Sequence, residues 1–296
     1  MTPSTIKRVR EGVAAARDRT VRHTIQKAFH QVTAIIEARP EFRVSGQLRR
    51  LVLRSLIHTF FRVKVEHPER IPRQATILAP NHLSHIDPLL LLAELPGQPY
   101  YYVLGDARTL YNQWWKRQIL EWSGGVIPLE RFWKEEIAII AATQTGRQDL
   151  AELATAIAQD VPSGSSIQSL RRIDRATQAL LTRGDGMILF PEGRLGNTEG
   201  QLHLPLKRGT AIYALRAGVP IVPVALIGTQ DLYWGKELTI RFGEPLHFSQ
   251  SNRPQPQVVK KVMTSLQNSL TALLPQNYQE PDGPKPLRYF LNHMLW

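Results

Sequence analysis

Several features are missing from this sequence, and each absence excludes a class of protein. There is no cysteine, which excludes a disulfide framework and a thiol nucleophile and fits a reducing compartment. No apolar stretch of a secretory signal precedes Arg39. The best apolar run, residues 217–228, has 12 residues and two prolines, whereas a transmembrane helix needs ~20 apolar residues. We therefore expect a cytoplasmic protein without a transmembrane helix, and any membrane contact to be peripheral.

Acidic residues are scarce at the N-terminus. Residues 1–64 hold 14 Lys and Arg against 4 Asp and Glu, a net charge of +10. The rest of the chain holds 23 Lys and Arg against 21 Asp and Glu, a net charge of only +2. The 43% hydrophobic content of the 296 residues indicates a globular chain, one large domain or a core with an appendage. The basic segment predicts an anionic partner surface, either membrane or nucleic acid.

Two basic amphipathic helices are predicted in this segment. Apolar residues recur at helical spacing from Ile6 to Ile36, in a helix ending near Pro40, and again from Gln47 to Phe61, with Arg and Lys on the other faces. Such helices bind a headgroup layer, or they pack as a hairpin on their own domain with Arg in water. We divide the chain into residues 1–62, basic helices for membrane docking, and residues 63–296, a catalytic domain.

The rest of the chain alternates strands with helices. This order predicts an α/β fold, a mostly parallel mixed sheet flanked by helices. Expected strands cover residues 62–66, 76–78, 100–104, 123–131, 187–190, 221–226 and 238–242. Expected helices cover residues 89–93, 111–122, 132–160, 167–182, 206–217 and 258–274, and the tail 275–285 reads as loop.

The most informative stretch is residues 78–88, Leu-Ala-Pro-Asn-His-Leu-Ser-His-Ile-Asp-Pro. His82 follows a short strand that Pro80 is expected to end, and Asp87 lies five residues on, at a helix start. Imidazole accepts a proton near neutral pH, and a carboxylate on its other nitrogen fixes the tautomer. The pair therefore predicts a general base. Two other interpretations are a polar pair without chemistry and a metal site with His85, although no cysteine is available for a structural zinc.

Two arginines also follow strands, Arg131 and Arg194. Ligands of such sheets bind outside the carboxyl ends of the strands, so both are expected to converge with His82. Forked guanidinium donors suit a phosphate, and Glu192 could hold Arg194 by a charged hydrogen bond. The plainer interpretation of each arginine is a surface ion pair of little energetic value.

Taken together, these segments resemble the glycerolipid acyltransferases, which act on 1-acylglycerol 3-phosphate or glycerol 3-phosphate. Residues 81–87 match their His-x4-Asp motif, and residues 125–131, 190–194 and 219–224 resemble their second, third and fourth blocks in order. The resemblance implies His82 as general base, Asp87 as its orienting group, and Arg131, Glu192, Gly193, Arg194 and Lys207 as binding the acceptor phosphate. It implies an acyl thioester donor, coenzyme A or acyl carrier protein, with no cofactor and no metal.

The sequence departs from the family pattern at three places. Arg194 follows Gly193 without the usual Thr, Glu130 stands where Asp is usual, and residues 141–185 are longer than expected. The implied reaction makes phosphatidate from 1-acylglycerol 3-phosphate, with glycerol 3-phosphate, another lysophospholipid or a glycolipid precursor as alternative acceptors. An inactive membrane adaptor is the alternative of another class. A nucleic-acid module is disfavoured because no helix-turn-helix or RNA module is found, so we expect an anionic membrane surface and no nucleic acid as partner.

Overall fold

The computed structural model describes residues 3–164 and 167–294, and the chain forms two interleaved compact units. The first combines residues up to Arg43 with Leu104–Ala176, and the second combines Val44–Val103 with residues from Thr177 onward. These units do not follow the expected boundary between residues 62 and 63. The assignment of residues 1–62 to a separate docking segment stays a prediction.

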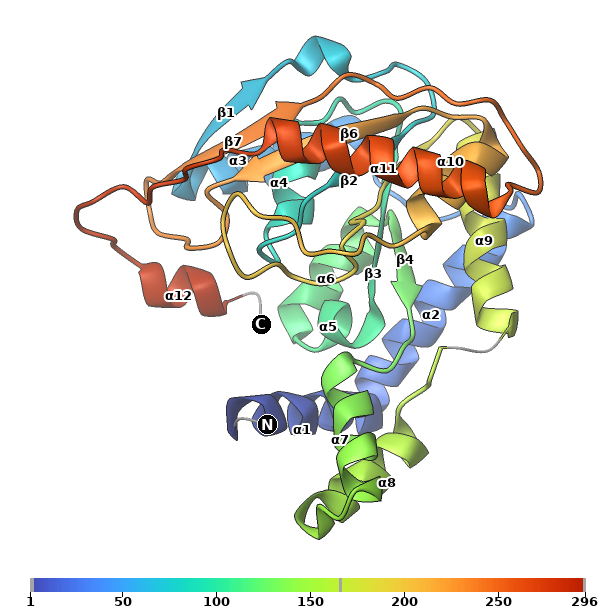
Figure 1. Ribbon diagram of the computed structural model, residues 1–296, viewed down its shortest axis with the longest axis vertical. Coiled ribbons are helices and arrows are strands. Elements are labelled where there is room, and N and C mark those ends of the chain that lie inside the picture. The colour runs from blue at the N-terminus through green and yellow to red at the C-terminus, as the bar shows by residue number, and fades with distance from the viewer. Residues whose placement is uncertain (1–2, 165–166, 295–296) are drawn as a thin grey trace. The chain divides into compact units, whose positions relative to one another are not determined.

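A mixed sheet with the order β1-β7-β6-β2-β5-β3-β4 confirms the predicted α/β fold class (Figure 1). β2 pairs in parallel with both β5 and β6, and β6 pairs with β7 in antiparallel fashion. All residues of β2 are buried, because a parallel strand inside such a sheet is covered on both faces. The strands are β1 Arg62–Glu66, β2 Ile77–Pro80, β3 Tyr101–Asp106, β4 Val126–Leu129, β5 Gly186–Ile188, β6 Ile221–Ile227 and β7 Glu237–Phe242.

Helices cover the sheet of the second unit. In Figure 1, α11 lies in front of β6, and its buried residues Val259, Val262, Leu266 and Leu270 follow helical spacing toward that strand. α3 packs on α4, and the Ser45 hydroxyl caps α3 by accepting the N–H of Leu48 at 3.2 Å. These helices are α3 Gly46–Phe60, α4 Asp87–Glu94, α10 Gly209–Ala217, α11 Pro256–Leu273 and α12 Arg288–His293, with the 3₁₀ turn η1 Pro68–Arg70.

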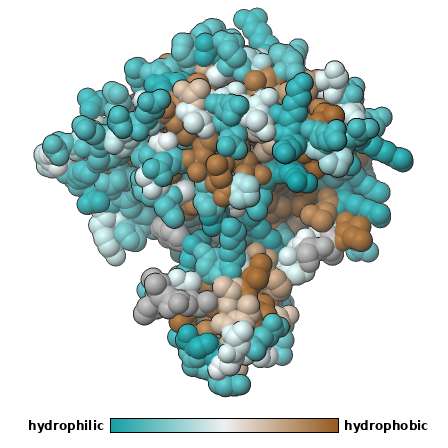
Figure 2. Space-filling model, viewed as in Figure 1, coloured by the Kyte–Doolittle hydropathy of each residue, from teal (hydrophilic) through white to brown (hydrophobic). Residues whose placement is uncertain are grey.

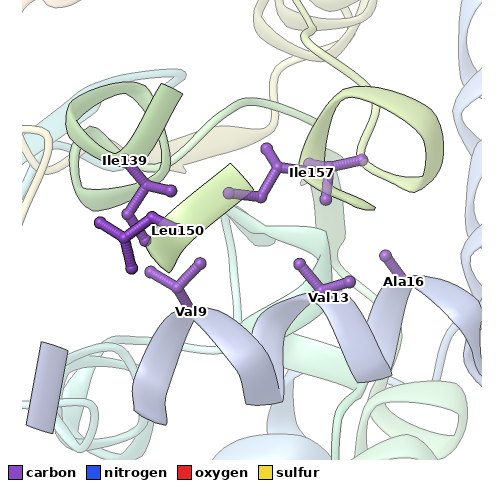
Figure 3. Close-up of a cluster of buried hydrophobic side chains, with 7 residues drawn as sticks. Val9, Val13, Ala16, Ile139, Leu150 and Ile157 are labelled. Atoms are coloured by element: carbon purple, nitrogen blue, oxygen red, sulfur yellow. The ribbon is translucent and has the colours of Figure 1, made fainter. Parts of the chain in front are cut away.

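The predicted helix from Ile6 to Ile36 is two helices, α1 Pro3–Arg17 and α2 Arg19–Ile36. Asp18 interrupts it, because its carboxylate accepts the N–H groups of Thr20 at 2.7 Å and Val21 at 2.9 Å and so caps α2. α1 then contributes Val9, Val13 and Ala16 to a core cluster (Figure 3). Figure 3 shows these side chains pointing toward Ile139, Leu150 and Ile157. The apolar face of α1 is thus buried within its own unit.

Other predicted helices are also divided. Residues 132–160 form α7 Lys134–Gln144, η2 Gln148–Leu150 and α8 Ala151–Asp160, because Gly146 adopts a left-handed φ of 103° that ends a helix. Residues 111–122 divide between α5 Ala107–Tyr111 and α6 Trp114–Ser123. α9 spans Ile167–Thr182 as predicted, whereas α12 was not anticipated. β2 includes Pro80 as its last residue, so it extends two residues beyond the predicted strand of residues 76–78.

The surface on the face drawn in Figure 2 is mainly hydrophilic, with patches of hydrophobic residues between. None of the helices described in the structure is long and apolar enough to cross a membrane.

Candidate active site

His82 stands where β2 ends and the turn into α4 begins. The preceding Asn81 is 1% exposed and binds the backbone of β6 twice. Its amide nitrogen donates to the Leu226 carbonyl at 2.9 Å, and its oxygen accepts the Leu226 N–H at 2.7 Å. Asn81, which the sequence reasoning gave no role, thereby attaches the backbone next to His82 to the neighbouring strand β6.

The predicted pair of His82 and Asp87 is formed. Nδ1 of His82 lies 2.9 Å from Oδ2 of Asp87, and the Asp87 side chain is fully buried whereas that of His82 keeps 16% of its surface exposed. A carboxylate only accepts hydrogen bonds, so Nδ1 carries the imidazole proton. Nε2 therefore holds the free lone pair, which is the protonation state that a general base requires.

The backbone of the turn holds Asp87 in place. Its Oδ2 accepts the N–H groups of Leu83 at 2.8 Å and Ser84 at 2.9 Å in addition to the imidazole. Asp87 is also the first residue of α4, where the positive end of the helix dipole favours a negative charge. The spacing of five residues thus places a carboxylate at a helix start, facing back to the histidine that precedes the turn.

Residues of the third block surround the imidazole from another strand. The Phe190 ring, just beyond β5, stacks on His82 with ring centres 4.0 Å apart. Glu192 is 1% exposed, and its two oxygens accept the N–H of His82 at 2.8 Å and the N–H of His203 at 2.6 Å. Burial raises the pKa of Glu192, and the two backbone hydrogen bonds and the nearby His82 oppose that rise. The carboxyl therefore joins two loops of the site, and its predicted contact with a phosphate stays a prediction.

Gly193, Arg194 and Lys207 lie together beside this carboxyl. Gly193 has a left-handed φ of 65°, and a Cβ added there would come within 2.9 Å of the Lys207 side chain. A glycine at this position therefore allows Lys207 to cross the turn closely. Nη2 of Arg194 lies 2.5 Å from Nδ1 of His203, a residue that the sequence reasoning did not single out.

Arg131 belongs to the first unit, and its convergence with His82 stays a prediction. Its Nε lies 3.7 Å from Oδ2 of Asp106, and its carbonyl accepts a hydrogen bond from Arg108 at 3.0 Å. Arg108 itself is buried and forms a double hydrogen bond with the buried Glu136, at 2.5 and 2.9 Å. A buried ion pair that the sequence did not reveal therefore fixes the backbone at Arg131.

The metal interpretation of His82, His85 and Asp87 gains no support. Within residues 3–164 and 167–294, no group of three His, Asp or Glu side chains is placed to hold a metal ion. The arrangement instead combines an imidazole whose Nε2 can accept a proton, a buried carboxylate and cationic side chains, which suits proton removal from an anionic substrate.

Known proteins resemble the chain over the region that holds this site. Residues 62–227 match the family model described as Acyltransferase. The human 1-acyl-sn-glycerol-3-phosphate acyltransferase alpha is 28% identical over 173 residues, which are 58% of this chain and 48% of that protein. The Probable 1-acyl-sn-glycerol-3-phosphate acyltransferase of Mycoplasma pneumoniae is 24% identical over 195 residues, which are 64% of this chain and 58% of that protein.

Among solved structures, the 1-acyl-sn-glycerophosphate acyltransferase PlsC from Thermotoga maritima matches 87% of this chain and 84% of its own, at 19% identity and a TM-score of 0.44. The chain spans about half the length of the human relative. The family model covers more than half of the chain, from β1 to the end of β6, and includes His82, Asp87, Arg131 and the third block. This chain therefore belongs to the acyltransferase family.

Proposed function

We propose that the chain transfers a fatty acyl group from an acyl thioester to the hydroxyl of 1-acylglycerol 3-phosphate, making phosphatidate. The observation that carries this proposal is the hydrogen bond between His82 and the buried Asp87, which leaves Nε2 of the imidazole able to accept a proton. The names of the relatives support the acceptor.

In this mechanism, Nε2 of His82 takes the proton of the acceptor hydroxyl while the hydroxyl oxygen attacks the thioester carbonyl carbon. The tetrahedral intermediate collapses, the carbon–sulfur bond breaks, and the thiolate leaves with the proton that His82 returns. Asp87 stabilises the imidazolium between these steps. No covalent enzyme intermediate is required, which agrees with the absence of cysteine and of a Gly-x-Ser-x-Gly sequence.

Labelled oleoyl-coenzyme A, offered with different acceptors, tests the proposal. The panel is glycerol 3-phosphate, lysophosphatidate, lysophosphatidylglycerol and lysophosphatidylcholine, each with wild type and with His82→Ala. We expect label in phosphatidate with wild type alone. Label in another product would assign one of the alternative acceptors. A donor series with acyl carrier protein follows if coenzyme A fails, and no product with either donor would favour the inactive adaptor.

We also propose that the chain works on an anionic membrane surface, and a contrast between two helices supports this. On α2, the apolar side chains are buried in the protein while Arg19, Arg22 and Lys27 are exposed, as in a self-packed helix. α3 differs, because it buries Arg49 together with Leu53 and Ile57 and exposes other apolar side chains. Arg49 is 4% exposed under the Tyr100 ring, and Arg54 is bound to Glu94.

The exposed side of α3 carries apolar residues at helical spacing, with 41–64% of each side chain in solvent: Leu48, Leu51, Val52 and Leu56. A continuous apolar face that water covers is unfavourable, and it fits the interfacial layer of a bilayer. Considered by itself, the exposed basic face of α2 also favours anionic lipid, at roughly 1 kcal/mol for each charge near the surface.

Sedimentation with vesicles containing phosphatidylglycerol tests the contribution of α3. Leu51→Ser combined with Leu48→Ser should lower the bound fraction, because both side chains would leave the apolar layer. Val258→Ser on α11 is the matched control, since Val258 is 41% exposed on another helix of the same unit. Equal binding by both variants would place the lipid contact elsewhere.

A further inference from the structure

The side chain of Arg194 is held by a residue that the family motifs do not include. Its Nη2 lies 2.5 Å from Nδ1 of His203. A guanidinium has only donors, so Nδ1 must accept, and the neutral imidazole carries its proton on Nε2. His203 therefore acts on Arg194 as a neutral acceptor.

The position of His203 is itself fixed from the catalytic side. Its N–H donates to one oxygen of Glu192 at 2.6 Å, and the other oxygen of Glu192 accepts the N–H of His82 at 2.8 Å. The backbone of His82 also accepts the N–H of Gly196 at 2.6 Å. A continuous set of hydrogen bonds thus runs from the general base through Glu192 and His203 to the guanidinium of Arg194.

A second cationic residue, Lys207, contacts the turn that carries Arg194. Lys207 crosses Gly193, and its N–H donates to the Pro191 carbonyl at 2.6 Å. Arginine and lysine side chains have many rotamers, and holding one rotamer before a ligand arrives removes part of the entropic cost of binding. His203 supplies that constraint for Arg194.

We propose that His203 is a positioning residue that sets Arg194 for the phosphate of the acceptor and favours a phosphomonoester over a phosphodiester. This inference rests on the proposed function of the same site. A phosphomonoester has three terminal oxygens and a second negative charge, whereas a phosphodiester has two such oxygens and one charge. The cationic side chains of Arg194 and Lys207 complement the additional oxygen and charge.

The test measures binding and turnover separately in four proteins: wild type, His203→Ala, His203→Gln and Gln201→Ala. The probe is a short-chain 1-acylglycerol 3-phosphate, titrated calorimetrically, with the corresponding 1-monoacylglycerol as the phosphate-free ligand. His203→Ala should raise both the Kd and the KM of the phosphate probe about tenfold. Its kcat and its KM for the thioester should change less than about twofold, because the general base is untouched.

The two other variants separate positioning from folding. The amide oxygen of His203→Gln still accepts from Arg194, so its Kd should stay within about threefold of wild type. Gln201→Ala removes an exposed side chain of the same loop and should bind like wild type. If His203→Ala lowers the melting temperature, His203→Leu, which keeps side-chain volume without the acceptor, takes its place.

A double-mutant cycle gives the decisive result. Because His203 acts through Arg194, the double variant Arg194→Ala with His203→Ala should bind the probe as weakly as Arg194→Ala alone. Additive losses, an unchanged Kd in His203→Ala, or equal losses for monoacylglycerol would overturn the inference. The Kd is measured without turnover. A wild type that binds the probe but transfers no acyl group would therefore refute the proposed function, and the Kd values would still show whether His203 positions Arg194.

Discussion

Two buried carboxylates, Glu136 in the first unit and Asp87 in the second, have similar surroundings but different basic partners. Both side chains are fully buried, and both accept backbone N–H groups near a helix start. Glu136 binds the guanidinium of Arg108 through both oxygens. Asp87 binds the imidazole of His82 through one oxygen, and its Oδ1 has no hydrogen-bond partner among the described residues.

The difference between these pairs lies in whether the partner exchanges a proton. A guanidinium does not give up its proton in proteins, so the pair of Arg108 and Glu136 only fixes structure. An imidazole can exchange a proton with a substrate, so the role proposed for the pair of His82 and Asp87 is chemical. The comparison predicts that changes at Asp87 affect rate and that changes at Glu136 or Arg108 affect stability.

The largest effect is expected for Asp87→Asn. Because Oδ2 of Asp87 accepts both backbone N–H groups and the imidazole, an asparagine oxygen at that place can accept the same three groups, but it lacks the negative charge that stabilises the imidazolium. We expect kcat to fall by about 10²–10⁴, the usual contribution of general base catalysis, with a small loss of stability. Initial rates of phosphatidate formation and a urea titration measure both quantities. A kcat within threefold of wild type would contradict the role assigned to the pair.

Removing the partner of Glu136 is expected to unfold the first unit more easily. Arg108→Ala leaves a buried carboxylate without its cation, which typically costs about 3–5 kcal/mol of stability. The free energy of unfolding from urea titration measures this loss. The loss should be far larger than in Arg147→Ala, because Arg147 and Asp149 form an exposed ion pair.

Replacing both partners sharpens the same contrast. Arg108→Met combined with Glu136→Leu removes both buried charges and keeps apolar volume, so the stability should recover most of the loss seen in Arg108→Ala. Thermal melting of the single and double variants compares them. A double variant as unstable as the single one would show that the hydrogen bonds to Arg131 and Trp133 matter more than the ion pair.

The smallest effect concerns Glu199, a third buried carboxyl, which forms no ion pair within residues 3–164 and 167–294. Burial raises the pKa of Glu199, so the folded chain holds that proton more tightly than the unfolded chain. The stability that this proton contributes is complete below the ordinary glutamate pKa and is lost as pH rises through the folded value. Glu199→Gln should therefore gain stability relative to wild type as pH rises from about 4 to about 8. A constant difference in unfolding free energy would contradict the raised pKa.

Local chemistry in the sequence predicted much of this protein. The alternation of strands and helices predicted the mixed α/β sheet, and the spacing from His82 to Asp87 predicted their hydrogen bond. Both follow from short-range rules, since a helix start five residues after a strand end brings the two side chains together. The cap at Asp18 is equally local, but the apolar periodicity continues across it and therefore predicts a single uninterrupted helix.

Contacts between distant segments were decided by the tertiary structure alone. Arg108 meets Glu136, Glu192 meets both His82 and His203, and Arg49 of α3 lies buried against Tyr100. The sequence predicted the arginines of α3 on a polar face and gave no signal for the pair of Arg108 and Glu136, because burial depends on which other segments pack against a residue. The sequence thus determined the fold class and the hydrogen-bonded pair of His82 and Asp87. Packing determined which charges are buried, because a buried charge persists only where the folded chain brings it a partner.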